Sequence, residues 1–126
     1  MYEVGLSHTF SARHVMPGAE GPEGTLHSHD YRIEVVASRP ELDRWGMVVD
    51  LDRLEEALSD TVAQVDDEDL EAIRPEGAEA VTVEILASWA HAELAGRLGA
   101  VEGHLAVRVW ESPIAFGGYS GPLRQD

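Results

Sequence analysis

Apolar and polar residues alternate in two stretches near the N-terminus, and such alternation is typical of β-strands. The first stretch runs from 2 to 12 and the second from about 26 to 38. Residues 16–25 between them are rich in glycine, proline and glutamate, which predicts a loop. Every second residue shares one face of its strand: Tyr2, Val4, Leu6, His8, Phe10 and Ala12 in the first stretch, and His27, His29, Tyr31, Ile33, Val35 and Ala37 in the second.

Two later stretches have the spacing of amphipathic helices. Asp50 can cap the first helix by accepting backbone N–H bonds, and Thr82 is the corresponding candidate for the second. Gly99 is a plausible end for the second helix. The apolar stripes are Leu51, Leu54, Leu58 and Val62 in the first helix, and Val83, Leu86, Ala87, Ala90, Leu94 and Leu98 in the second.

The remaining segments complete an order of β-β-α-α-β-β. Residues 45–50 form a short apolar strand or a turn, 66–71 an acidic loop or short turn, and 74–80 a second polar loop. Alternation returns at 105–111, which predicts a third long strand, and 114–119 is a possible fourth strand interrupted by two glycines. Strands that bracket two helices indicate an α+β fold, in which helices pack on one face of an antiparallel sheet.

Composition narrows the possible partners. The chain has 126 residues, enough for a single domain spanning 1–126, and its formal net charge is −15. All nine basic residues are arginine and none are clustered, so nucleic acid and an anionic membrane surface are not expected partners. Cysteine is absent, which excludes disulfides and a thiol nucleophile. With no membrane-spanning run and no signal-peptide profile, we expect a cytoplasmic protein.

The histidines are the main candidates for chemistry. His27 and His29 lie two residues apart at the start of a strand, so their side chains project side by side from one face. Neutral imidazole is the commonest protein ligand for a divalent transition metal. Two nearby histidines are often only surface or hydrogen-bonded residues, and a metal site needs a third ligand. His14 can supply it, because it has the parity of the first strand's shared face.

Five motifs in order now resemble the 6-pyruvoyl-tetrahydropterin synthase and 6-carboxy-tetrahydropterin synthase family. The resemblance covers nearly the whole chain, and each motif is weak alone. The motifs are Phe10-Ser-Ala-Arg-His14, Leu26-His-Ser-His-Asp-Tyr31, Gly46-Met-Val-Val-Asp-Leu51, the acidic run Val65–Leu70 followed by the helix start at Thr82, and Val107-Arg-Val-Trp-Glu111.

The resemblance implies a tunnelling fold: a four-stranded antiparallel sheet with two helices on one face. It also implies a homohexamer, formed when two barrel-shaped trimers stack, with active sites between subunits. By the same resemblance one Zn²⁺ per chain is held by His14, His27 and His29, with an open position for water or substrate. Glu111 is expected to anchor a pterin ring, with Thr82 at the pterin pocket and Glu84 following it.

The sequence departs from the family at two of its three proton-transfer positions. Glu23 occupies the position of the family's cysteine. The family's Asp-His pair corresponds to Asp66 and Asp67, so the aspartate is kept and the histidine is replaced. Some relatives with glutamate at the cysteine position cleave the dihydroneopterin side chain instead of rearranging it, but they keep the Asp-His pair.

Two hypotheses of different classes follow. In the first, the protein is a zinc-dependent, lyase-type enzyme acting on a dihydropterin-like substrate, with Glu23, Asp66 and Asp67 as catalytic candidates and little or none of the parent activity. In the second, it binds a pterin- or purine-like ligand without converting it. A third possibility is a degenerate hexamer that no longer holds metal.

Overall fold

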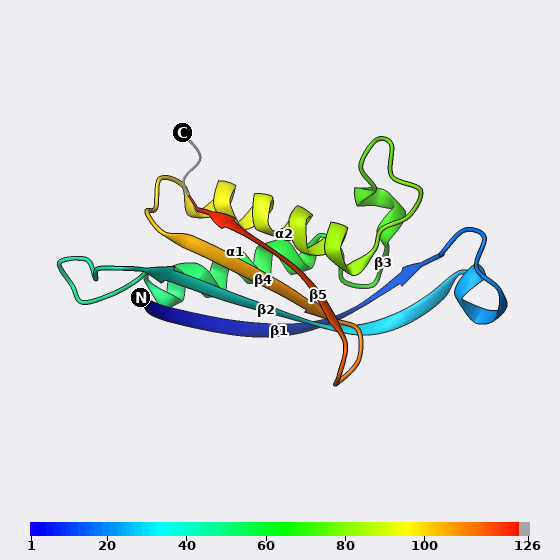
Figure 1. The fold of residues 1–126 in the computed structure, drawn as a ribbon, viewed down its shortest axis with the longest axis horizontal. Coiled ribbons are helices and arrows are strands. Elements are labelled where there is room, and N and C mark those ends of the chain that lie inside the picture. The colour runs from blue at the N-terminus through cyan, green and yellow to red at the C-terminus, as the bar shows by residue number, and fades with distance from the viewer. Residues whose placement is uncertain (124–126) are drawn as a thin grey trace.

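The computed structural model describes residues 1–123 and shows a sheet with both helices on one face (Figure 1). Helices α1 (Leu51–Ala63) and α2 (Val83–Leu98) form that layer. Two 3₁₀ turns, η1 (Gly21–Gly24) and η2 (Leu70–Ile73), lie in the connections. No helix in this described part is long and apolar enough to cross a membrane. The sheet order is β3-β1-β2-β4-β5, with strands β1 (Tyr2–His14), β2 (His27–Arg39), β3 (Glu68–Asp69), β4 (His104–Trp110) and β5 (Phe116–Pro122).

The α+β architecture is confirmed, but the expected four-stranded antiparallel sheet is wrong in one respect: the sheet has five strands. The extra strand, β3, is only two residues long and pairs parallel to β1. It arises in the segment for which the sequence predicts a loop. Asp67 adopts a left-handed backbone conformation (φ 59°) that turns the chain, and its N–H donates to the Ser11 carbonyl at 2.6 Å. That bond lays the following residues along β1.

The helix caps form where the sequence predicts them. The Asp50 carboxylate accepts from the Asp52 N–H at 2.9 Å, and the Thr82 hydroxyl accepts from the Ile85 N–H at 3.2 Å. The segment from 45 to 50, for which strand and turn were both open, is a turn. The Asp43 carboxylate holds this turn by accepting two backbone N–H bonds from the residues that follow it.

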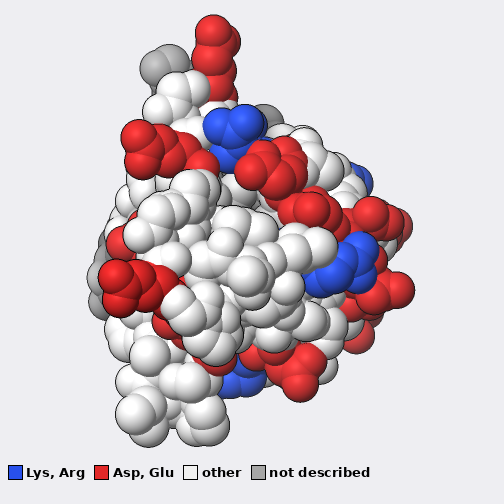
Figure 2. Space-filling view, turned by 90° about the vertical axis from the view of Figure 1, so that its right-hand side faces the viewer, with Lys and Arg blue, Asp and Glu red and all other residues white. Residues whose placement is uncertain are grey.

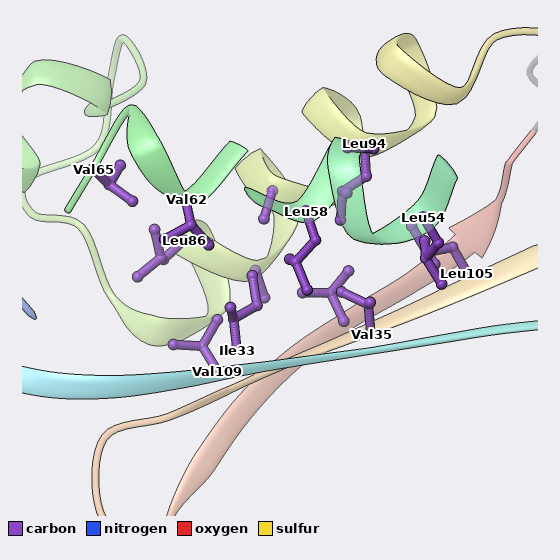
Figure 3. Close-up of a cluster of buried hydrophobic side chains, with 14 of the residues drawn as sticks. Ile33, Val35, Leu54, Leu58, Val62, Val65, Leu86, Leu94, Leu105 and Val109 are labelled. Carbon is purple, nitrogen blue, oxygen red and sulfur yellow. The ribbon is translucent and has the colours of Figure 1, made fainter. Parts of the chain in front are cut away.

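The core lies between the helices and the sheet face defined by the alternating residues (Figure 3). Side chains of β2 and β4 point toward apolar side chains of α1 and α2. Fully or almost fully buried members include Ile33, Val35, Leu54, Leu58, Leu86, Leu94, Leu105 and Val109. The opposite face of the sheet carries no helix in the described structure (Figure 1).

The β1–β2 hairpin extends beyond both helices at one end of the molecule (Figure 1). Its strands are antiparallel, with Phe10 opposite Tyr31 and His14 opposite His27. The face that is buried under the helices therefore continues, without a change of parity, into the histidines at the end of the hairpin. The packing of the core thus determines the direction in which these histidines point.

We predict that Leu54→Ala costs about 2–5 kcal/mol of unfolding free energy, because it leaves a cavity in a fully buried position. Leu51→Ala, on the same helix but 43% exposed, should change that free energy by only about 0.5 kcal/mol. Urea unfolding followed by circular dichroism measures both. Equal losses for the two variants would contradict this description of the core.

Candidate metal centre

Four side chains meet at the end of the β1–β2 hairpin. The potential ligand atoms of His14, Glu23, His27 and His29 all lie within 4.8 Å of one another. His14 is the last residue of β1 and faces His27, the first residue of β2, while His29 faces Ala12. The structure therefore brings together the three histidines that the sequence suggests as ligands, and it adds Glu23 to them.

Two separations in this cluster are close to those of a tetrahedral metal site. The two Nε2 atoms of His27 and His29 are 3.0 Å apart, and Glu23 Oε2 is 3.2 Å from His27 Nε2. Zinc bonds of about 2.0–2.2 Å at tetrahedral angles place ligand atoms roughly 3.3–3.6 Å apart. The two observed separations are only slightly shorter. A metal ion can therefore fit among these atoms with small adjustments of the side chains.

A backbone contact fixes the tautomer of His27. Its Nδ1 lies 2.7 Å from the Thr25 carbonyl oxygen, and because that oxygen has no proton, Nδ1–H must be the donor. In a neutral ring this leaves a lone pair on Nε2, the atom that faces His29 and Glu23. Such an outer hydrogen bond is typical of metal-ligating histidines, since it orients the ring and makes it a stronger ligand.

His14 is buried, with 6% of its surface exposed, and neither ring nitrogen has a hydrogen-bond partner among the described residues. Burial is the main cause that lowers the pKa of His14. The charge of His27 lowers it further, and His29 contributes less. The nearby Val81 backbone, with which His14 makes no well-formed hydrogen bond, and the Glu23 carboxylate raise the pKa of His14. A buried imidazole without a partner is costly, and a bound metal ion would give it one.

The loop between the strands presents Glu23 to the histidines. Glu23 lies in η1, whose position is set by a bond from the Met16 N–H to the Glu23 carbonyl at 2.9 Å. Gly24 allows this close packing, because a Cβ atom there would lie 2.1 Å from the Ala19 carbonyl oxygen. The site therefore depends on a loop conformation that requires glycine.

Tyr31 and Glu111 border the cluster. Tyr31 follows His29 on the same face of β2, and the centroids of the two rings are 5.7 Å apart. Tyr31 is buried, with 2% of its surface exposed. The register Arg32↔Trp110 places Glu111, just past the end of β4, beside Tyr31. Burial raises the pKa of the Tyr31 phenol, and the negative charges of Glu111 and Glu23 raise it further. Sequence reasoning missed Tyr31, although its parity with His27 and His29 signals the same location.

The start of α2 lies near the same end of the sheet. The Thr82 hydroxyl is engaged in capping the helix, and the Val81 backbone influences His14. Glu84 packs against β5: a Cβ atom added to Gly117 would lie 3.0 Å from Glu84 Oε1. This places Glu84 between the helix and the last strand, in contact with the protein's own backbone.

Asp66 and Asp67 do not join the histidines within the chain. The Asp66 carboxylate accepts from the Ser11 N–H at 3.2 Å, and Asp67 pairs with Arg13 at 3.4 Å. Ser11 and Arg13 point to the face of β1 opposite to His14, because neighbouring strand residues alternate. The Asp67 side chain is 92% exposed. A catalytic role for these aspartates stays a prediction that the geometry of one chain does not support.

The end of the molecule that carries the hairpin shows neutral side chains surrounded by Asp and Glu, with few arginines (Figure 2). Together with the formal net charge of −15, this distribution gives a negative electrostatic potential. Such a potential favours the approach of a cation to the hairpin end. An anionic ligand would need positive charge at the site itself, which a metal ion would supply.

Comparison with known proteins gives three findings. The family model for 6-pyruvoyl tetrahydropterin synthase matches residues 3–122. The comparison of sequences with curated proteins found no match. Three similar solved structures share the fold. The 6-pyruvoyl tetrahydropterin synthase of Caenorhabditis elegans has a TM-score of 0.74 and 23% sequence identity, and the match covers 95% of this chain and 95% of that chain. The enzyme of Plasmodium falciparum has a TM-score of 0.75 and 14% identity, with coverages of 96% and 98%. A mutant of the Plasmodium vivax enzyme has a TM-score of 0.76 and 16% identity, also with coverages of 96% and 98%.

We predict that the metal-free protein, prepared with a chelator, loses stability as the pH falls. His14 has a pKa below its ordinary value of 6.5 in the folded protein. Near that pH the unfolded chain therefore binds a proton that the folded protein resists, so the unfolding free energy decreases as the pH drops through this range. Urea unfolding at several pH values between about 5 and 8 measures the slope.

The exposed His8 provides a control for this slope. His8→Gln should keep the wild-type pH dependence, whereas His14→Leu should reduce it. If His14→Leu and the wild type show the same slope, burial of His14 is not its source.

Proposed function

We propose, from the premise that this chain belongs to the 6-pyruvoyl tetrahydropterin synthase family, that it binds a pterin-like ligand beside a metal ion. His14, His27 and His29 would hold the ion, and zinc suits three imidazoles in tetrahedral geometry. The observation that carries the proposal is the histidine cluster, with its buried, unpartnered His14 and the preset tautomer of His27. When bound, the metal would polarise a hydroxyl or carbonyl on the ligand's side chain.

Glu111 is the proposed anchor for the pterin ring. A pterin presents a ring N–H and an exocyclic amino group along one edge, and one carboxylate can accept from both. Glu111 is exposed, so its carboxylate is available to a ligand. Its charge also reaches the Tyr31 phenol, which lies next to His29. A ligand held by Glu111 would therefore extend toward the metal, with Thr82 and Glu84 at the nearby start of α2 as further candidates for contact.

Glu23 is the best-placed residue of this chain for moving a proton at the metal. Two solved structures of the Plasmodium vivax enzyme carry alanine or cysteine in place of a catalytic glutamate, so a glutamate can serve in this family. Asp66 and Asp67 lie away from the histidines of their own chain. We propose that they contribute to the site of a neighbouring subunit.

A homohexamer of two stacked trimers would provide that neighbour. Over the described residues, β5 forms one edge of the sheet, and at the other edge β3 pairs only with Ala12 and Arg13 of β1. Most of β1 and all of β5 thus present unpaired backbone groups, which proteins rarely leave uncovered. Closure of the sheets of three chains into a barrel would pair these edges.

Binding without conversion is the second candidate function. One specific observation favours it: Asp67, which stands where the family has histidine, is exposed and pairs with Arg13 instead of approaching the metal cluster. Apart from the three histidines proposed as metal ligands, the described residues around the site therefore offer no acid–base group with a near-neutral ordinary pKa. The same metal and the same Glu111 anchor would then serve to hold a pterin or purine.

We predict that Glu111→Gln weakens binding of neopterin or biopterin about ten- to a hundredfold. The amide replaces one acceptor oxygen by a donor that faces a donor of the ligand, and losing a charge-assisted hydrogen bond costs about 1.5–3 kcal/mol. Calorimetric titration measures the affinity. Glu84→Gln makes the same change at the weaker candidate contact and should reduce the affinity less, because Glu84 packs against Gly117. Unchanged affinity in Glu111→Gln would rule out this anchor.

We also predict little or no conversion of dihydroneopterin triphosphate to the pyruvoyl product by the zinc-loaded protein. General acid–base catalysis contributes about 10²–10⁴-fold in rate, and the family's thiol and imidazole are both replaced here. Chromatography of the reaction mixture after long incubation measures both substrate and product. Turnover at ordinary enzymatic rates, about 1–10³ per second, would show that the remaining carboxylates suffice.

A further inference from the structure

We propose that Glu23 is a fourth metal ligand, which closes the coordination shell in the resting protein and is displaced when an oxygen-bearing ligand binds. This inference rests on the proposed metal site. It gives Glu23 a role different from that of a proton carrier outside the shell.

The first argument is the position of the carboxylate. Glu23 Oε2 lies 3.2 Å from His27 Nε2, nearly the same as the 3.0 Å between the two histidine nitrogens. A group that acts only from outside the shell would be separated from the other ligands by a layer of water or substrate. Glu23 instead occupies the place of a direct ligand, within 4.8 Å of every other ligand atom.

The second argument is that the loop is built for this placement. Residues on both sides of Glu23 are fixed: the Thr25 N–H donates to the Pro22 carbonyl at 3.2 Å, and Gly21 has a left-handed backbone (φ 71°). The Met16 N–H holds the Glu23 carbonyl itself. With the backbone held in this way, the carboxylate loses little further freedom when it binds a metal.

The third argument concerns which ligand can leave. The Glu23 side chain is 55% exposed, against 16% for His27, and His14 is buried. The histidines extend from paired strands, whereas Glu23 comes from the loop. Glu23 thus covers the outward side of the cluster, and it is the ligand that can swing away with the least loss of packing. The incoming ligand should therefore carry a hydroxyl or carbonyl oxygen to take its place.

Charge supports the same assignment. Three neutral imidazoles leave both positive charges of a divalent ion uncompensated, and one carboxylate removes half of that charge at the site. A carboxylate bound to the ion is a poor base, because the cation stabilises its anionic form. Displacement by the incoming oxygen would free Glu23 beside the ligand. Glu23 would therefore alternate between two roles, metal ligand in the resting protein and proton carrier once the ligand is bound.

The test is a measurement of zinc affinity by competition with a chromogenic chelator. Removing even an outer partner of a ligand commonly costs about 10–100-fold in metal affinity, so Glu23→Gln should weaken zinc binding at least about tenfold. Glu20→Gln is the matched control: it removes the same charge from an exposed residue of the same loop and should leave the affinity unchanged. His27→Ala should abolish binding.

Cobalt(II) substitution provides a second readout that does not depend on activity. The visible absorption spectrum of the cobalt protein should differ between wild type and Glu23→Gln, because one ligand has changed. Addition of neopterin should alter the wild-type spectrum as the carboxylate is replaced. If Glu23→Gln matches the wild type in both zinc affinity and cobalt spectrum, Glu23 is not a ligand, and the three-histidine site stands. If the wild type binds no zinc at all, the metal site itself is refuted.

Discussion

The register between β1 and β2 is the constraint on which the rest of the structure depends. The same strand face carries Ile33 and Val35 into the core and His27 and His29 into the candidate metal site. A slip of one residue would turn every side chain of β2 to the other face, so the core and the ligand set would be lost together. Hydrophobic packing under α1 and α2 therefore holds histidines that those helices do not cover.

Alternation and capping made most of the fold predictable from sequence. Period-two patterns locate β1, β2 and β4 to within a few residues, and Asp50 and Thr82 mark the helix starts, because these are local preferences. β3 was not predictable. It depends on the left-handed backbone of Asp67 and on a bond to Ser11, a residue far away in the chain, and no local pattern reports such a contact.

The candidate site also contains residues that could be predicted from sequence and residues that could not. The three histidines could be grouped from sequence, because strand parity aligns His27 with His29, and the parity of His14 together with the family resemblance adds the third. The approach of Glu23 to these histidines could not be predicted, since it depends on the conformation of a glycine-rich loop. The separation of Asp66 and Asp67 from the histidines is likewise a tertiary result, set by their bonds to Ser11 and Arg13. Residues whose roles depend on long-range contacts are those for which sequence reasoning was least informative.

All four cluster residues lie within one hairpin, between positions 14 and 29. Contacts so close in sequence form early in folding, because closing a short loop loses little chain entropy. A metal ion captured there would join the ends of β1 and β2 before α2 and β4 arrive from more distant parts of the chain. The ion would then act as a folding nucleus as well as a ligand site, and cells short of metal would accumulate less of the folded protein.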